Sequence, residues 1–419
     1  MKRSKDQLPS NNDGNNKFES EETYKKIVKD LCEVSIDCES KNKKIAIGEV
    51  GIEFVGQINT QTIDGCKKKE GFAIGPSTFE LHWKQPPKAV LITKSEYSEK
   101  AEKALEDIFD YLTNEKKTKV FVEPKVWNQL KWKNLSTFMV ADDEQYDIPT
   151  FLSECEVGKC CDPPKGCFQR IKTLQNLHEI IDFVICLGGD GTMLHTASLF
   201  QLAVPPILGF NLGSLGFLAS FDVEGYKKYI DQVFQGDVYL SPRMRLTCKI
   251  RRADGQISEE RHQILNELVL DRGPSPFLTN LECYCNNTFI TSVQADGIIV
   301  ATPTGSTAYS MSAGGSICHP NVNCIMLTPI CPHTLSFRPI LLPDSTILTL
   351  RVPDEARGTA WTSFDGKCRQ ELKKGDAIIV TTSVWPVPLI TKVDETSEWF
   401  RHLTGSFNWN AREQQKSFK

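Results

Sequence analysis

Apolar runs and segments of helical period alternate along residues 85 to 236. Residues 101, 105, 108 and 112 are apolar and recur at the spacing of one helix face. Short apolar runs on either side of them predict strands at residues 88–94, 119–122, 183–187 and 206–210. Strands that alternate with helices are typical of a parallel sheet covered by helices. We therefore predict an α/β domain over residues 85–236.

The hydrophobic pattern changes after residue 237, where short β-rich runs follow one another. Turn signals such as Asp254-Gly255 and Asp365-Gly366 separate these runs. The predicted strands fall at residues 246–250, 269–270, 281–284, 298–300, 347–350 and 377–381. Residues 237–396 are predicted to form a β-rich, β-sandwich-like domain, and the aromatic segment 397–419 to pack back on the first domain. The predicted fold class is thus α/β plus all-β, with the parallel α/β domain N-terminal.

Two regions lack this patterning. Residues 1–84 are polar and repeatedly interrupted by Asn, Gly, Lys and Glu, which predicts an arm that is disordered over much of its length. Residues 137–167 read as a loop insertion that carries four cysteines, at positions 155, 160, 161 and 167. Their spacing fits no common C-x₂-C pair, so loop thiols are favoured over a zinc site.

Composition narrows the class of protein. The 419 residues are 40% hydrophobic and 24% charged, with a net charge of -4 and a pI near 6.1. This balance argues against general binding to nucleic acid or to an anionic membrane, for which a basic surplus is typical. No run approaches the ~20 apolar residues that span a bilayer, and the N-terminus has no apolar run of a signal peptide. We expect a cytoplasmic protein.

The first candidate for chemistry is the turn Gly188-Gly189-Asp190-Gly191. It follows a predicted buried strand and precedes a helix-like segment, an arrangement in which backbone N–H groups approach a phosphate closely. A Walker A motif is absent, because the Lys-Ser/Thr pair is missing. Asp190 would be repelled by phosphates unless it binds Mg²⁺ or accepts a proton from an attacking hydroxyl. The alternative is that Asp190 caps the helix.

Further along the chain, polar and small residues cluster in two places. Asn266 and Glu267 offer a carboxamide and a carboxylate, which suit ribose hydroxyls and adenine edges. Neighbours on a regular strand face opposite sides, so both can reach one ligand only if the strand is irregular there. The alternative is an exposed strand-end pair. Residues 302–309, Thr-Pro-Thr-Gly-Ser-Thr-Ala-Tyr, permit close backbone approach to a ligand; the alternative is a Pro-Gly turn leading into a helix.

Taken with the segment 211–217 (Asn-Leu-Gly-Ser-Leu-Gly-Phe), Asp296-Gly297 and the block 329–339, these motifs resemble the NAD kinase family over about residues 85–410. Diacylglycerol, sphingosine and 6-phosphofructo-kinases carry turns similar to residues 188–191, so the later blocks decide. The resemblance looks closest to animal cytosolic members. It implies that ATP is the phosphoryl donor, that Mg²⁺ or another divalent cation accompanies it, and that the protein is a homo-oligomer, a dimer or a tetramer.

The resemblance also implies roles for residues. Asp190 would be the catalytic base, with ATP over Gly188 to Gly191. The adenosine half of NAD would contact Asn266 and Glu267, and Asp296 would face the nicotinamide-side ribose. Bacterial members often carry a basic residue where Gln294 stands, which leaves its role open. The remaining positions implied for the NAD site are Thr307, Ala308, Tyr309, Ser310 and Ser312. His333 and Arg338 are candidates for an interface or ligand role, and Lys367 for reaching ligand across an interface.

The expected reaction is transfer of the γ-phosphoryl group of ATP to the 2′-hydroxyl of the adenosine ribose of NAD, which gives NADP and ADP. Two alternatives stay open. A diacylglycerol-kinase-like lipid kinase would lack the Asn-Glu pair and the run 302–309. A non-catalytic nucleotide-sensing module would be expected to have lost the carboxylate at position 190. His178 and His195 lie on helix-like segments and are expected to be ordinary surface or packing residues.

Overall fold

A computed structural model describes residues 52–55, 79–96, 98–123, 125–126, 136–137, 177–213, 216–391 and 395–410. Most of the predicted arm and all four cysteines at 155–167 lie outside these ranges. The described chain divides into two compact units. The first unit, called the α/β unit, contains the described residues up to Arg245, residues 319–321 and those from 384 onward. The second, called the β-rich unit, contains residues 246–318 and 322–383.

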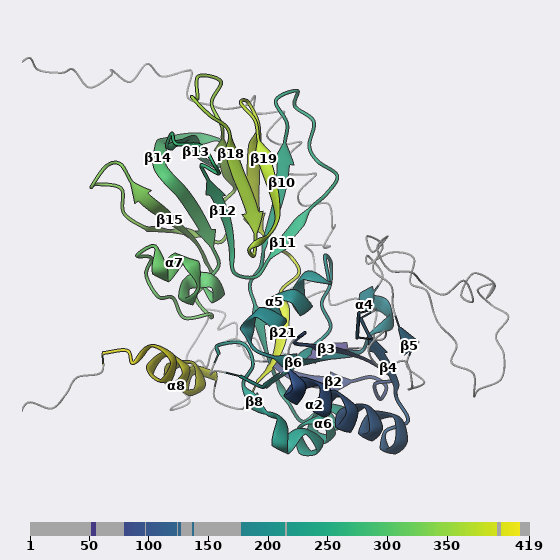
Figure 1. Ribbon diagram of the computed structural model, residues 1–419. Helices are drawn as coiled ribbons and strands as arrows, with labels where there is room; N and C mark the ends of the chain where they lie inside the picture. The colour runs from purple at the N-terminus through teal and green to yellow at the C-terminus, as the bar shows by residue number, and fades with distance from the viewer. Residues whose placement is uncertain are drawn as a thin grey trace, which may run out of the picture. The chain divides into compact units, whose positions relative to one another are not determined.

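The α/β unit is built on one mixed sheet (Figure 1). Ten strands of this sheet are described. Their order is β1-β2-β9-β21-β7-β6-β3-β4-β5, and β8 pairs with β7. Neighbours from β21 through β5 run parallel, whereas β1, β2, β9 and β21 pair antiparallel. The strands are β1 Ile52–Val55, β2 Phe79–Trp83, β3 Ala89–Lys94, β4 Lys119–Val122, β5 Ser136–Thr137, β6 Phe183–Gly188, β7 Ile207–Asn211, β8 Phe221–Asp222, β9 Tyr239–Arg243 and β21 Val387–Thr391.

The central strands are buried on both faces. All six residues of β3 and of β6 are buried, as parallel strands covered on each side require. Helices α2 (Glu99–Asp110) and α6 (Tyr226–Gln235) share one core cluster with Ile92 and Ile185. On the other face, Thr93 Oγ1 lies 2.6 Å from Thr196 Oγ1 of α5, Asp190–Ser198. Helices therefore cover both faces of the sheet.

Local signals set the helix ends. The N-cap of α2 is Ser98, whose side chain accepts a hydrogen bond from the Ala101 N–H. Helix α6 ends at its C-cap residue Gly236, whose φ of +75° lies in the left-handed region that favours glycine. A short α4 (Leu177–Ile180), a π-turn Tyr111–Glu115, a 3₁₀ turn Val223–Gly225 and the C-terminal α8 (Glu395–Phe407) complete the described helical segments of this unit.

The β-rich unit is an antiparallel sheet of eleven described strands in the order β11-β10-β20-β17-β13-β14-β12-β18-β19, with β15 between β14 and β16. The long β14 pairs with β13 through its first half and with β12 and β15 through its second half. The strands are β10 Leu246–Arg251, β11 His262–Ile264, β12 Glu267–Asp271, β13 Thr279–Cys285, β14 Thr288–Ala301, β15 Cys324–Pro332, β16 Ile340–Pro343, β17 Leu348–Arg351, β18 Ala360–Phe364, β19 Lys367–Leu372 and β20 Ala377–Thr382. A 3₁₀ turn Thr304–Thr307 and α7 (Tyr309–Ser312) follow β14.

The predicted fold class is confirmed, whereas the structure draws the boundaries differently. The sheet of the α/β unit includes β1 and β2, which the sequence assigned to the arm, and Leu81 of β2 is fully buried. It also includes β9 and β21, which the sequence assigned to the β-rich domain. These strands have ordinary β patterns, and a local pattern does not state which sheet a strand joins. Within the described ranges, no helix is long and apolar enough to cross a membrane.

Candidate active site

The turn between β6 and α5 carries Gly188-Gly189-Asp190-Gly191. Gly189 is the N-cap of α5 and has no side chain to satisfy the first N–H groups of the helix. A side chain on Gly188 would overlap the side chain of Thr192. The nine-residue α5 therefore begins with uncapped N–H groups at the carboxyl edge of the parallel strands. Such a helix end attracts anions.

The Asp190 carboxylate is held by another segment of the chain. Its two oxygens accept hydrogen bonds from the N–H groups of Phe217 (2.8 Å) and Leu218 (3.0 Å). A Cβ on Gly216 would overlap this carboxylate, so the close approach needs a glycine there. Asp190 is the first residue of α5 and its carboxylate bonds outside that helix, so the alternative of a simple helix cap is not what the structure contains. The motifs at 188–191 and 211–217 meet here.

A ring stack lies behind Phe217. The Phe217 ring stacks on Phe407 of α8 at a centroid distance of 5.5 Å, and the His402 ring meets it edge-on at 6.1 Å. His402 is almost fully buried. The C-terminal helix thus packs on the segment that holds Asp190.

In the β-rich unit, the chain bends at Leu265 and Asn266 just before β12 begins at Glu267. The N–H groups of these three consecutive residues all donate to the Asp365 carboxylate, at 2.8, 2.8 and 3.0 Å. Successive N–H groups of a regular strand point in opposite directions. The irregularity that the Asn266-Glu267 pair needs, if both are to reach one ligand, is therefore present.

The Glu267 side chain is buried, with 9% of its surface exposed, and its Oε2 has no hydrogen-bond partner among the residues that the structure describes. Burial and, to a smaller extent, the neighbouring negative charge of Asp365 raise the pKa of Glu267 from 4.5 to about 7, against the opposing effect of a hydrogen bond from the Tyr309 backbone. A buried polar atom without a partner is unusual. It marks a position at which a ligand would complete the hydrogen bonding.

The run 302–309 packs directly against this bend. The Thr302 N–H donates to the Asn266 carbonyl (2.9 Å), and the Thr302 hydroxyl donates to the Leu265 carbonyl (2.5 Å). A Cβ on Gly305 would overlap the Asn266 backbone, so only glycine permits this contact. The motifs at 266–267 and 302–309 therefore form one local assembly.

The residues after this turn differ in how far they reach solvent. Thr307 and Ala308 are half-buried, while Tyr309 and Ser312 are exposed, Tyr309 by 44%. Ser310 is fully buried, and its hydroxyl lies 3.0 Å from that of Thr328. The Ser310 side chain is thus engaged inside the protein, while its neighbours can meet a ligand.

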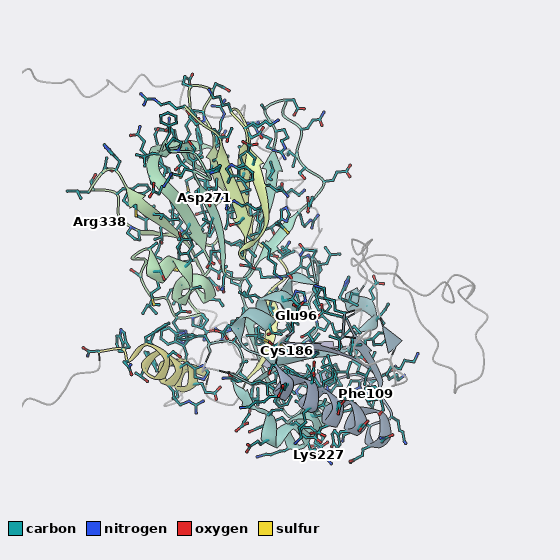
Figure 2. The ribbon with its side chains drawn as sticks, in the orientation of Figure 1. Glu96, Phe109, Cys186, Lys227, Asp271 and Arg338 are labelled. Atoms are coloured by element: carbon teal, nitrogen blue, oxygen red, sulfur yellow. The ribbon has the colours of Figure 1, made fainter. Side chains whose placement is uncertain are left out.

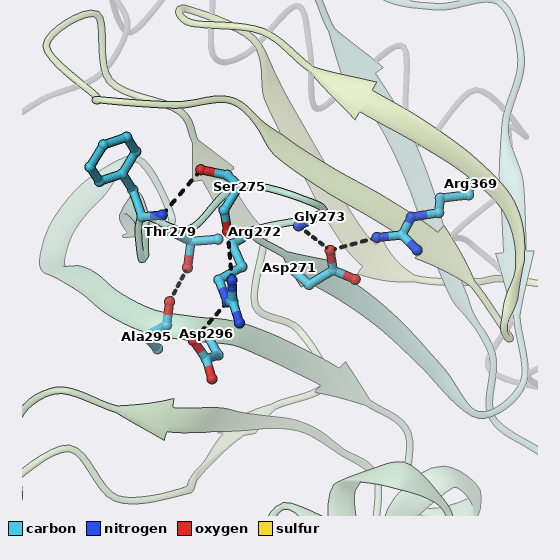
Figure 3. Close-up of polar contacts among 9 residues, drawn as sticks. Asp271, Arg272, Gly273, Ser275, Thr279, Ala295, Asp296 and Arg369 are labelled. Atoms are coloured by element: carbon cyan, nitrogen blue, oxygen red, sulfur yellow. Dashed lines mark hydrogen bonds and ion pairs between the residues drawn. The ribbon is translucent and has the colours of Figure 1, made fainter.

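Asp296 lies at the other end of the β12–β14 pair. Glu267 pairs with Ala301 whereas Asp271 pairs with Gly297, so Asp296 is roughly 15 Å from Glu267 along the strands. Its carboxylate accepts a hydrogen bond from Arg272 Nε at 2.9 Å, and Arg272 also donates to the Ser275 carbonyl (Figure 3). Asp296 is therefore grouped with Arg272, and not with the Asn266-Glu267 bend.

The other predicted residues are spread over the β-rich unit. Gln294 is exposed, and its carbonyl accepts a hydrogen bond from the His333 N–H at 2.9 Å. His333 and Arg338 are exposed on the segment between β15 and β16, where Figure 2 shows Arg338 at the outer end. Lys367 is exposed just after the Asp365-Gly366 turn.

Three polar residues of these sites were not predicted from the sequence. Asp365 was interpreted only as part of a turn, and Arg272 was not singled out. His195, expected to be an ordinary surface or packing residue, lies with its Nε2 2.6 Å from Glu123 Oε2 in the α/β unit. The Asp-Gly pair was the available signal for Asp365, because it places a carboxylate at a hairpin turn. Nothing local points to the N–H groups that it holds.

A divalent cation fits the donor chemistry of the turn at 188–191. No group of three or more His, Cys, Asp or Glu side chains among the described residues could hold a metal by itself. Mg²⁺ is usually bound by one or two carboxylates together with substrate phosphates and water. Asp190 supplies one carboxylate, and its oxygens have lone pairs beyond those that the two N–H groups use.

Comparisons with known proteins bear on the whole of this arrangement. Residues 90–238 match the ATP-NAD kinase N-terminal domain, and residues 265–392 match the ATP-NAD kinase C-terminal domain. A crystal structure of yeast NADH kinase complexed with NADH is 31% identical, with a TM-score of 0.68, and the alignment covers 88% of this chain and 96% of that one. The chain belongs to the NAD kinase family. The resemblance inferred from the motifs is thereby confirmed.

Other members of the family are also similar. A probable chloroplastic NAD kinase 2 of Oryza sativa is 46% identical over 82% of this chain and 33% of its own length. An ATP-NADH kinase of Saccharomyces cerevisiae is 51% identical over 65% of this chain and 58% of its own length. A crystal structure of an NAD kinase from Archaeoglobus fulgidus, at 18% identity and a TM-score of 0.50, shares the fold. The chain spans between about a third and two thirds of the length of the curated relatives it matches.

Proposed function

We propose that this chain is an NAD kinase that transfers the γ-phosphoryl group of ATP to the 2′-hydroxyl of the adenosine ribose of NAD or NADH. The observation that carries the proposal is the Asp190 carboxylate, fixed by two N–H groups at the uncapped start of α5. Membership of the NAD kinase family supports the choice of substrates. The yeast NADH kinase was crystallised with NADH, and the Archaeoglobus fulgidus NAD kinase with ATP.

In the proposed mechanism, Asp190 acts as the general base. The Phe217 and Leu218 N–H groups hold its carboxylate in one orientation and leave lone pairs free on both oxygens. One of these lone pairs takes the proton of the 2′-hydroxyl as the hydroxyl oxygen attacks the γ-phosphorus and the bond to ADP breaks. The N–H groups at the start of α5 stabilise negative charge on the phosphates. A divalent cation beside Asp190 would supply further charge neutralisation.

For NAD, we propose two contact regions in the β-rich unit. The bend at Asn266-Glu267 with Thr307, Ala308, Tyr309 and Ser312 would hold the adenosine half. The Asp296–Arg272 pair, with Gln294 near it, would lie toward the nicotinamide-side ribose. The Ser310 side chain is left out of this proposal because its hydroxyl is engaged with Thr328.

We further propose that the enzyme uses Mg²⁺ or another divalent cation, assembles as a homo-oligomer and works in the cytosol. His333, Arg338 and Lys367 would then serve an interface or a ligand from the exposed edge of the β-rich unit. The described cysteines are thiols, including Cys318 and Cys324 whose sulfur atoms lie 3.7 Å apart. Free thiols are typical of a reducing compartment, and a fluorescent fusion would test which compartment it is.

The direct test is incubation of the purified full chain with NAD or NADH, ATP and MgCl₂, followed by chromatographic detection of the 2′-phosphorylated product. We expect product that increases linearly with time and with enzyme, and none when ATP is omitted. Diacylglycerol replaces NAD in a parallel reaction to test the lipid-kinase alternative. Absence of product from both dinucleotides, in a sample that melts cooperatively, would contradict the proposal.

A further inference from the structure

Asp365 occupies the turn between β18 and β19, 98 residues from Glu267 in the sequence. Asp365 and Gly366 have φ +46° and +74°, as a tight hairpin turn of the primed type requires. The carboxylate accepts three N–H bonds from the bend before β12, and the Asp365 N–H donates to the Glu267 carbonyl at 3.0 Å. A charged acceptor shared by three N–H groups fixes the backbone of residues 265–267 firmly.

The same carboxylate brings a negative charge close to Glu267. Among the described residues, no cation forms an ion pair with Glu267. Its carboxyl group is hydrogen-bonded by the backbone N–H of Tyr309. Phe364 precedes Asp365 in the sequence, and the His262 ring stacks on the Phe364 ring at a centroid distance of 3.8 Å. Burial lowers the pKa of His262, so this ring adds no full positive charge at neutral pH. In the part of the chain that the structure describes, Glu267 thus has a negatively charged neighbour in Asp365 and no ion pair of its own.

We infer that Asp365 is a positioning residue of the NAD site that holds the Asn266-Glu267 bend in place and favours the neutral acid form of Glu267, which can donate a hydrogen bond to the nucleotide. The inference rests on the proposed function. A neutral acid has an O–H donor that an ionised carboxylate lacks. The group that receives this hydrogen bond would be an acceptor of the nucleoside, a ring nitrogen or a ribose oxygen. The neutral form also adds no repulsion toward the phosphates.

This inference predicts a pH dependence of NAD binding. The pKa of Glu267 is about 7, so the donor is present below pH 7 and lost above it. Titration calorimetry with NAD alone, between pH 5.5 and 8.5, measures the Kd without turnover. We expect the Kd of the wild type to increase with a midpoint near pH 7.

Two variants separate charge from shape. Asp365→Asn keeps the size of the side chain but removes its charge and one acceptor oxygen. We expect a Kd for NAD about tenfold higher at pH 6, since one lost N–H bond of this kind has such an effect, and a midpoint shifted to lower pH. Glu267→Gln keeps a permanent donor, so its Kd is expected to be constant within twofold across the same pH range.

Asp254→Asn is the matched control, because Asp254 also belongs to an Asp-Gly turn of the β-rich unit and accepts an N–H bond, from Gln256. Its Kd and midpoint should equal those of the wild type. A Kd curve of Asp365→Asn that is merely displaced upward, with the wild-type midpoint, would mean that Asp365 only braces the backbone. If Asp365→Asn does not fold, Glu267→Gln decides: a midpoint near pH 7 in that variant overturns the inference. Absence of NAD binding by the wild type at every pH would instead refute the proposed NAD site.

Discussion

Two N–H groups fix the Asp190 carboxylate, and this arrangement allows its charge to be tested apart from its structural role. Asp190→Asn keeps the shape but turns one oxygen into an NH₂ group, which cannot accept the second N–H bond. We expect kcat to fall by ~10²–10⁴-fold, the usual contribution of a general base, and the stability to fall by about 1 kcal/mol. Steady-state kinetics and thermal unfolding of the same preparation measure both quantities.

Asp182→Asn provides the matched control for this prediction. Asp182 immediately precedes β6 in the same unit, and one of its carboxylate oxygens accepts the N–H groups of Lys88 (2.6 Å) and Ala89 (2.8 Å). An amide oxygen at position 182 can still accept both bonds, so the control should lose less stability than Asp190→Asn and keep its kcat. A kcat of Asp190→Asn within twofold of the wild type would remove Asp190 from the base role.

The buried Glu267 carboxyl predicts a stability that depends on pH. Its pKa is raised from 4.5 to about 7, so its contribution is fully present below pH 4.5 and is lost as the pH rises to 7. The loss amounts to about 3 kcal/mol. We expect Glu267→Gln to unfold at higher urea than the wild type at pH 8, and the difference to shrink markedly at pH 5. Glu355→Gln, on an exposed loop, should unfold at the same urea concentration as the wild type at both pH values. An equal effect of Glu267→Gln at the two pH values would contradict the raised pKa.

Motif residues could be predicted from the sequence, but several of their partners could not. Asp190 and the Asn266-Glu267 pair stand in short patterns of residue types that suit phosphate and ribose. Asp365 is joined to that pair by the pairing of β12 with β18, and a contact across a hundred residues leaves no mark in the local sequence. Ser310, which the family resemblance implied for the NAD site, has its hydroxyl 3.0 Å from that of Thr328, a contact that no local pattern predicts.

At the scale of elements, helix α8 and the segment after Gly216 act together, because Phe407 stacks on Phe217 and Phe217 donates its N–H to Asp190. An aromatic pair of this kind contributes about 0.5–1.5 kcal/mol. We therefore expect Phe407→Ala to lower kcat by roughly 2–10-fold and to leave the KM for NAD within twofold. Kinetics at saturating ATP measure this split.

Phe400→Ala is the comparison for this variant, since Phe400 lies on the same helix and its ring meets that of Trp399 edge-on instead. Its kcat should match the wild type. Equal losses of kcat in the two variants would show that α8 acts through general stability and not through Phe217.

Strands buried on both faces were the easiest elements to predict. The runs 88–94 and 183–187 correspond closely to β3 and β6 because such strands are continuously apolar. For the fourteen-residue β14, the sequence indicated only residues 298–300. Its first half is exposed at every second position, so polar residues interrupt the apolar pattern there. Likewise, β9 and β21 were assigned to the wrong sheet because hydrophobic alternation does not encode a pairing partner.

At the scale of the whole molecule, the chain leaves the α/β unit after Arg245 and, apart from residues 319–321, returns to it at Val384. Strand β21 then lies between β9 and β7 and is buried along its length. A chain that ends at Ser383 should therefore lose the cooperative unfolding of the α/β unit while the β-rich unit keeps its protection. Hydrogen exchange followed by mass spectrometry separates the two units in one experiment.

A chain that ends at residue 394 is the control, because it retains β21 and lacks α8. We expect normal exchange protection of β6 and β7 in this control. Full protection of those strands in the chain that ends at Ser383 would mean that the sheet closes without β21.

The return of the chain to its first sheet has a consequence for synthesis on the ribosome. Ribosomes add ~5–20 residues each second, so on the order of ten seconds pass between completion of β9 and of β21. During this interval, all strands of the β-rich unit emerge, while β9 and β7 wait with unpaired edges. Unpaired strand edges invite aggregation. We therefore expect the β-rich unit to fold before the sheet of the α/β unit is complete, so the nascent α/β half is the part most open to aggregation.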